Sequence, residues 1–449
     1  MNPGLPSLPH WQQQLQRVAE HAAERARHLG ATAQTGVSER VGRSITVRHG
    51  EVETIEHHRE RTLSVTVYLD GRTGHAATSD LSPRAIEATV QAAVAIARHT
   101  EPDPAAGLPD PSWLADPSAA PDLGCYHPWS VTPETLIALT QRLEAAGTAQ
   151  TGIVNSEGAT CTTEVELSAI ANTLGFSGVT AETVHSYSCV LLAQSDDGSL
   201  VRDGAWASRR AVDQLPDPEA LGAEAATRAL QRRNARRLPT GRYDVVFSPE
   251  VAPSLLSHFV AAASGGALYR RATFLLERFE TQLFPEWFSI QEDPWLPQGF
   301  GSCPFDAEGV RVAPRLVIDQ GRWVGRFLSS YTARKLGLTS TGNAGGAHNL
   351  LPTTTHDSLA ALLASVDRGL LITELLGHGV NTVTGEYSRG AAGFWFENGT
   401  IAFPVHEITV SGMLPELFAG LIGVADDARP DRRFRLGSTA IAAVQIAGQ

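Results

Sequence analysis

The feature that most constrains the fold is a series of short alternating runs separated by glycine turns. Runs rich in β-branched residues at 44–48, 52–55 and 63–69 are separated by His49-Gly50 and Asp70-Gly71. An Asp-Gly pair between alternating segments is a strong hairpin signal, because both turn positions need a positive φ. The sequence therefore predicts an antiparallel sheet close to the N-terminus.

After this sheet, segments with helical periodicity and segments with strand alternation are grouped separately along the chain. Apolar residues recur every three or four positions at 11–29, 83–99, 133–147 and 218–234. Alternation returns between Cys161 and Val212, where Asp197-Gly198 marks another hairpin. Regular strand-helix-strand alternation is missing, so we expect an α+β fold with antiparallel sheets and segregated helices rather than a doubly wound one.

The length of 449 residues corresponds to about three domains at roughly 150 residues each. Four segments are expected: an N-terminal α+β lobe at 1–100, a proline-rich linker at 101–126, a middle antiparallel-sheet and helix lobe at 127–238, and a mostly β C-terminal lobe at 239–449. In the last lobe we expect helices around 251–276 and 358–368 and a strand at 323–328.

Charge and composition exclude several classes of protein. The net charge is -12, from 36 basic and 48 acidic residues, and such a chain repels nucleic-acid phosphates and anionic lipids. No apolar run approaches membrane-spanning length, and residues 1–10 lack the pattern of a secretory signal, so we expect a cytoplasmic protein without nucleic-acid or membrane partners. The four scattered cysteines are interpreted as small, buried apolar thiols.

The usual signatures of hydrolases are absent. A zinc peptidase helix of the HExxH type is not found, because His406-Glu407 lies in a predicted strand with no second histidine at helical spacing. Neither a GxSxG serine motif nor a phosphate-binding GxxxxGK loop occurs. What remains is a set of polar residues in glycine-rich loops, which indicates a binding surface.

Several long runs in the C-terminal third resemble one known family. These runs are Pro304–Val310, Ser330–Leu338, Ser340–Gly346 and Tyr387–Gly399, with a weaker match at Asn172–Gly178. They resemble the TldD/PmbA metallopeptidase family, in its PmbA (TldE) branch. Nearly the whole chain is compatible with this resemblance.

The resemblance implies a cytosolic protease built as a heterodimer of TldD and PmbA subunits that acts on unfolded peptides. In that family the TldD subunit carries zinc on a helix with the pattern HExxxH, together with a cysteine near its C-terminus. The corresponding positions here are His258, Phe259 in place of glutamate, and Ala263 in place of the second histidine, and no cysteine follows Cys303. We therefore expect a regular, apolar-faced helix, no metal or cofactor on this chain, and zinc on a TldD-like partner.

The first functional hypothesis is a non-catalytic subunit that holds extended peptides for its zinc-bearing partner. Its candidate substrate-binding residues are Asn343, His348, Glu386 and Arg389. Substitution of Asn343 or Arg389 is then expected to lower peptide turnover by the mixed complex without preventing assembly.

Two other hypotheses stay open. The chain could be a regulatory or binding protein of the gyrase-modulator type, acting alone or as a homodimer when the partner is absent. It could also be an independent peptidase that uses unfamiliar residues, such as His348 with Glu386 or His378.

Overall fold

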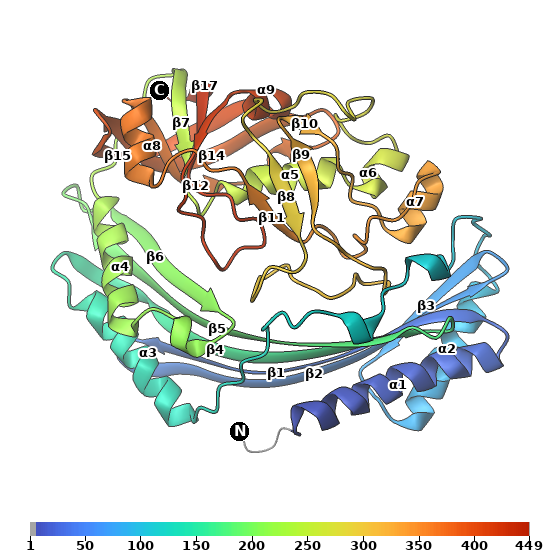
Figure 1. Cartoon of the computed structure of the whole chain (residues 1–449). Coiled ribbons are helices and arrows are strands. Elements are labelled where there is room, and N and C mark those ends of the chain that lie inside the picture. The colour runs from blue at the N-terminus through green and yellow to red at the C-terminus, as the bar shows by residue number, and fades with distance from the viewer. Residues whose placement is uncertain (1–5, 449) are drawn as a thin grey trace.

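The computed structural model describes residues 6–448 and has two parts, a long curved sheet and a lobe that sits against its concave face (Figure 1). The sheet has six strands in the order β3-β2-β1-β4-β5-β6, and all neighbours are antiparallel. Its strands are β1 (Thr32–Arg48), β2 (Glu51–Leu69), β3 (Arg72–Thr78), β4 (Ile153–Asn172), β5 (Ser177–Gln194) and β6 (Leu200–Arg209).

The predicted hairpins are confirmed, but the strands are much longer than predicted. His49 and Gly50, and likewise Asp70 and Gly71, have the positive φ values that such turns need. Strand β1 runs unbroken through Glu39, a charged residue on its helix-facing side. That carboxylate accepts hydrogen bonds from Trp11 Nε1 at 2.8 Å and from two arginines of β2, so the polar residue interrupts the pattern but not the strand.

Four helices cover the convex face of the sheet in two pairs (Figure 1). They are α1 (Leu8–His28), α2 (Pro83–Ala97), α3 (Pro133–Thr148) and α4 (Pro218–Gln231). The first pair shares a core with β1, β2 and one half of β4, and the second pair shares a core with β5, β6 and the other halves of β1 and β4. Each helix buries an apolar stripe, as its periodicity predicts. The helices therefore stay on one face, and the opposite face is left for the C-terminal lobe.

The strands on either side of the proline-rich segment belong to one sheet. Strand β1 pairs with β4 from Gln34↔Asn172 to Val47↔Ala159. The segment at 101–126 is irregular and lies against the C-terminal lobe, where Arg334 donates to the carbonyl oxygens of Ala105, Gly107 and Leu108. The lobe boundaries stay a prediction, but residues 32–78 and 153–209 share one continuous sheet.

The C-terminal lobe is mostly β, as expected. One sheet contains β7 (Gly241–Phe247), β12 (Gly369–Leu376), β13 (Val380–Asn381), β14 (Glu386–Glu397), β15 (Thr400–Met413), β16 (Leu421–Val424) and β17 (Thr439–Ala447). Because β12 pairs with both β7 and β14, the strands β12, β7, β17, β15 and β14 close into a ring. A second sheet holds β8 (Ile290–Asp293), β9 (Arg315–Asp319), β10 (Arg322–Trp323) and β11 (Asn349–Pro352). The α+β class with antiparallel sheets and segregated helices is confirmed.

The helices of this lobe are short. They are α5 (Pro253–Ala262), α6 (Gly265–Tyr269), α7 (Ser330–Leu336), α8 (Leu359–Val366) and α9 (Leu414–Ala419). The single helix predicted at 251–276 is wrong, because the extended Ser264 ends the first helical segment and caps the second. The strand predicted at 323–328 is also wrong beyond Trp323, since the chain leaves the sheet and Phe327 forms an isolated bridge with Ser264. Among residues 6–448, no helix has both the length and the hydropathy needed to cross a membrane.

Candidate functional site

Helix α5 and the residue after it carry the positions that are predicted from the sequence to correspond to the zinc motif. The Phe259 side chain is fully buried at the centre of the largest core, with edge-on contacts to the rings of Phe284, Trp323, Phe327 and Phe418 at 5.8–6.4 Å between centroids. Ala263 is also fully buried and directly follows the helix. The helix is regular and buries Leu255, Leu256, Phe259 and Ala262, which matches the prediction of an apolar face.

His258 packs against Tyr387 of β14, away from the aromatic cluster around Phe259. Its ring lies 6.0 Å from that of Tyr387, at an edge-on angle, and Arg389 is close enough to act on it electrostatically. Burial and then the Arg389 charge lower the pKa of His258, so the imidazole is neutral near pH 7. His258 Nε2, the Tyr387 hydroxyl and Arg389 Nε are each buried without a hydrogen-bond partner in the described chain.

These residues do not fit a zinc ion. Zinc sites in proteins use imidazole, thiolate and carboxylate ligands, and a hydrolytic site also needs a base for the bound water. Around His258 the chain offers a phenol, a guanidinium and an apolar core. Within residues 6–448 there is no group of three His, Cys, Asp or Glu side chains arranged to hold a metal ion.

The four predicted substrate-binding residues fall into two separate places. Asn343 and His348 belong to the loop before β11, whereas Glu386 and Arg389 lie on β14. Glu386 is exposed and accepts a hydrogen bond from Thr384 Oγ1, and Arg389 donates to the carbonyl oxygen of Leu375. The structure therefore does not bring the four residues together in one cavity.

The buried side chain of Asn343 holds its own loop in place through hydrogen bonds. Its side chain is 5% exposed, its Oδ1 accepts from Arg315 and Thr341, and its Nδ2 donates to Glu292 at 2.8 Å. Every polar atom of the amide is paired, so the side chain fixes the shape of the loop rather than facing a ligand.

His348 lies beside a thiol that we interpreted from the sequence only as a packing residue. Cys303 Sγ is 3.3 Å from His348 Nδ1, and His348 Nε2 is 2.8 Å from the carbonyl oxygen of Gly342. This arrangement assigns the proton to Nε2 and makes Nδ1 the acceptor of the thiol. Burial raises the pKa of Cys303 to about 12, so this cysteine is a thiol and not an activated nucleophile at neutral pH.

Two cavities meet at Cys303, between the edge of the long sheet and the loops of the C-terminal lobe. One has a volume of about 630 Å³ and is lined by β4, β5 and residues 120–127. The other, of about 230 Å³, is lined by residues 300–307, the loop at 344–348 and Arg433. Both include Glu182, Ser302 and Cys303 in their walls, so they are neighbouring cavities, which we together call the cleft.

The larger cavity contains an open sheet edge. Strand β6 pairs with β5 only from His185 onward, and the Thr183 amide donates to the carbonyl oxygen of Cys125. Backbone groups of alternate residues point the same way along a strand, so those of Val179 and Ala181 face the cavity with no neighbouring strand in the described chain. This edge can bind an extended peptide through main-chain hydrogen bonds.

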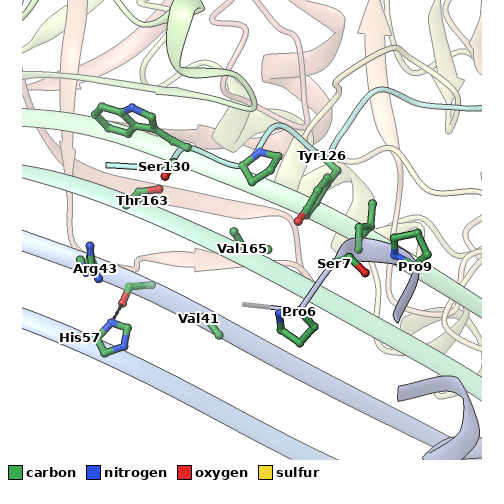
Figure 2. A pocket seen from close by; sticks show the side chains of 14 residues that line it. Pro6, Ser7, Pro9, Val41, Arg43, His57, Tyr126, Ser130, Thr163 and Val165 are labelled. Atoms are coloured by element: carbon green, nitrogen blue, oxygen red, sulfur yellow. Dashed lines mark hydrogen bonds between the residues drawn. The ribbon is translucent and has the colours of Figure 1, made fainter. Parts of the chain in front are cut away.

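A third cavity, of about 510 Å³, opens on the helix-covered side of the sheet, as shown in Figure 2. Its lining includes Val41, Arg43 and His57 of the first two strands, together with Tyr126 and Trp129. His57 Nδ1 lies 3.1 Å from the carbonyl oxygen of Gly42, and Arg43 donates to the carbonyl oxygen of Val131. Its wall is mainly apolar, and it contains none of the residues predicted from the sequence.

Known proteins resemble this chain over nearly its full length. Domain profiles of the PmbA/TldA metallopeptidases match at 34–97 (domain 1), 126–233 (central domain) and 240–448 (C-terminal domain). Metalloprotease PmbA of Escherichia coli O157:H7 is 42% identical over 97% of this chain and 96% of its own length. The Metalloprotease PmbA homolog of Haemophilus influenzae is 38% identical over 97% of each chain.

Solved structures share the fold. A Bacteroides thetaiotaomicron protein described as a proposed modulator of DNA gyrase superposes with a TM-score of 0.90 at 26% identity, covering 96% of this chain and 98% of that one. TldE of Thermococcus kodakarensis gives a TM-score of 0.85 at 19% identity, covering 96% of this chain and 100% of that one, which supports the fold alone. The chain therefore belongs to the PmbA/TldD metallopeptidase family, in its PmbA (TldE) branch.

Proposed function

We propose that this chain is the non-catalytic subunit of a cytoplasmic two-subunit metalloprotease, in which a TldD-like partner carries the zinc and unfolded peptides are the substrate. The observation that carries this proposal is the surroundings of α5. Phe259 is fully buried among four aromatic rings at the position that corresponds to the glutamate of the motif. A benzyl side chain cannot take a proton from water, and Ala263 has no atom that can bind a metal.

The contribution of this subunit is to hold peptides. The free edge of β5 in the 630 Å³ cavity accepts a chain in extended form through backbone groups. Such binding tolerates many side chains and excludes folded proteins, whose backbone groups are already paired. Of the predicted contacts, His348 lines the same cleft, whereas Asn343 shapes it indirectly.

The alternative is a regulatory or binding protein that acts alone or as a homodimer. The description of the Bacteroides thetaiotaomicron relative as a proposed gyrase modulator is the observation in its favour. The net charge of -12 opposes direct contact with DNA.

Co-expression with a TldD-like relative separates these functions. Size-exclusion chromatography is expected to give a mixed complex, and a peptidase assay on an unstructured peptide is expected to give chelator-sensitive cleavage by the pair. If no complex forms and the partner cleaves equally well without this chain, the accessory-subunit proposal fails and the binding-protein alternative is favoured.

A further inference from the structure

The smaller cavity of the cleft lies next to the open edge of β5. It shares Glu182 with the larger cavity, and Glu182 directly follows the open edge at Val179 and Ala181. An extended peptide that lies along this edge therefore has its next group, or its end, at the mouth of the 230 Å³ cavity.

The wall of this cavity presents an unneutralised cation. Arg433 is exposed, and its guanidinium makes no hydrogen bond or ion pair within residues 6–448. Its backbone is fixed, because the Arg433 carbonyl oxygen accepts from Leu350 N, and Arg435 N donates to the Leu350 carbonyl oxygen at 2.8 Å. The side chain thus projects from a held segment into a polar cavity.

The chain segment that carries Arg433 also holds other arginines. The guanidiniums of Arg209, Arg429, Arg432 and Arg435 all act on the single carboxylate of Asp431. Glu250 also reaches Arg429, at 3.7 Å, but it is shared with Arg228. Around Asp431 the arginines therefore outnumber the carboxylates that act on them, which leaves a local excess of positive charge in the segment next to Arg433.

The carboxylates that line the cavity do not cancel this excess. Glu182 is paired with Arg210 at 2.9 Å. Asp306 accepts hydrogen bonds from three backbone N–H groups. Burial, and to a smaller extent the charge of Glu308, raises the pKa of Asp306 to about 7. Its carboxyl group is therefore only partly ionised near neutral pH. An incoming anion therefore meets Arg433 with little competition.

The opposite wall leaves room for a ligand to approach the backbone. Gly345 and Gly346 have φ values of +97° and +106°, a region that side-chain-bearing residues avoid. A Cβ on Gly346 would lie 3.7 Å from Arg433 Nη1, in the space beside the guanidinium. The glycines keep this space open.

We propose that the cavity between Gly346 and Arg433 is a carboxylate-binding subsite for extended peptides bound along β5. The proposal rests on the peptide-holding role proposed above. The carboxylate belongs either to the C-terminus of the peptide or to an aspartate or glutamate side chain, since both present the same planar anion to a guanidinium.

Fluorescence anisotropy with the full-length chain tests the subsite. Three labelled, unstructured peptides of one length are used: one with a free C-terminus and no acidic residue, its C-terminal amide, and the amide with one internal glutamate. The wild-type chain is expected to bind at least one carboxylate peptide about 5–10-fold more tightly than the neutral amide. This is the gain in affinity expected from one partly exposed, charge-assisted hydrogen bond. The peptide that shows this preference identifies the source of the carboxylate.

The variant Arg433→Gln is expected to remove that preference while it leaves binding of the neutral amide unchanged. Arg433→Lys should keep part of it, because a point charge remains without the bidentate geometry. Arg84→Gln is the matched control, since Arg84 is an exposed arginine on α2 far from the cleft. Three results would overturn the proposal. They are equal binding of all three peptides by the wild-type chain, no detectable binding of any peptide, and an identical effect of the Arg433 and Arg84 variants. This measurement does not involve a TldD-like relative. Failure of the subunit proposal would instead be detected in the co-expression experiment described above.

Discussion

The ring of Phe259 lies edge-on to that of Trp323, with 6.4 Å between their centroids, and both side chains are fully buried. We infer that Phe259 takes the position that the glutamate has in the zinc motif of the family. At this position of α5 the chain therefore has an apolar core residue and not the polar residue of a hydrolytic site.

Restoring the glutamate should damage the fold and not create a metal site. Phe259→Glu places a carboxyl among aromatic rings without a partner, and its expected cost is about 3 kcal/mol or more in the free energy of unfolding. Phe259→Leu, which keeps the position apolar, should cost only about 1–2 kcal/mol. Urea unfolding of both variants measures the difference, and a Phe259→Glu chain as stable as Phe259→Leu would contradict this assignment of the helix.

The open edge of β5 predicts a specific effect of proline. The amide of Ala181 points away from β4, so Ala181→Pro should leave the sheet intact within about 1 kcal/mol and weaken peptide binding by about 5-fold or more. Thr180→Pro is the matched control, because the amide of Thr180 points into the sheet and its loss should destabilise the fold by about 3 kcal/mol. Chemical denaturation and peptide anisotropy measure the two effects. Undiminished peptide binding by folded Ala181→Pro would exclude this edge as the binding strand.

Glu39 predicts an acid-dependent part of the stability. Burial acts to raise the pKa of Glu39, but hydrogen bonds from Trp11, Arg59 and Arg61 outweigh it and hold this pKa below the ordinary value of 4.5. The folded pKa is therefore the lower one, so the stabilisation is complete above about pH 4.5 and is lost as the pH falls through the folded value.

Glu39→Gln should accordingly lower the free energy of unfolding by about 1–3 kcal/mol at pH 7. The difference from the wild-type chain should shrink as the pH is lowered toward 3. Urea unfolding at a series of pH values measures it, and a difference that stays constant across the series would contradict this role of the carboxylate.

The cysteines should be unreactive in the folded chain. Burial raises the pKa of all four thiols, to about 11 for Cys161 and to about 12 for Cys189 and Cys303, and also raises that of Cys125. Alkylation by iodoacetamide at pH 7.5 should be slower by on the order of 100-fold than in the urea-unfolded chain. Mass spectrometry of timed samples follows each thiol. Rapid labelling of Cys303 in the folded chain would mean that His348 activates it and would reopen the independent-peptidase hypothesis.

The sequence predicted the local structure best where one pattern acted alone. The amphipathic helices and the Asp70-Gly71 hairpin were predicted correctly because their signals are contained in a few residues. The full length of β1 was missed because Glu39, a buried charge with distant partners, interrupts the apolar alternation. The continuity of the long sheet depends on pairing β1 with β4 across more than a hundred residues, which no local pattern encodes.

The cleft was predicted only in part for a similar reason. His348 was singled out from its glycine-rich loop, but the walls of the cavity also come from Glu182, Cys303 and Arg433, which are far apart in the sequence. Arg433 is one of 35 arginines, counted as 36 basic residues less the single Lys335. Arg433 was not singled out from the sequence, because its place in the wall of this cavity, without an ion-pair partner in the described chain, is set by the fold.

The measurement that tests the central claim most directly is the metal content and activity of the purified proteins. This chain, its TldD-like partner and their complex are analysed by mass spectrometry for zinc and assayed on an unstructured peptide. The account predicts no stoichiometric zinc and no cleavage for this chain alone, and one zinc per mixed complex together with chelator-sensitive cleavage. Stoichiometric zinc on the isolated chain, abolished by His258→Ala and accompanied by peptide cleavage, would contradict it.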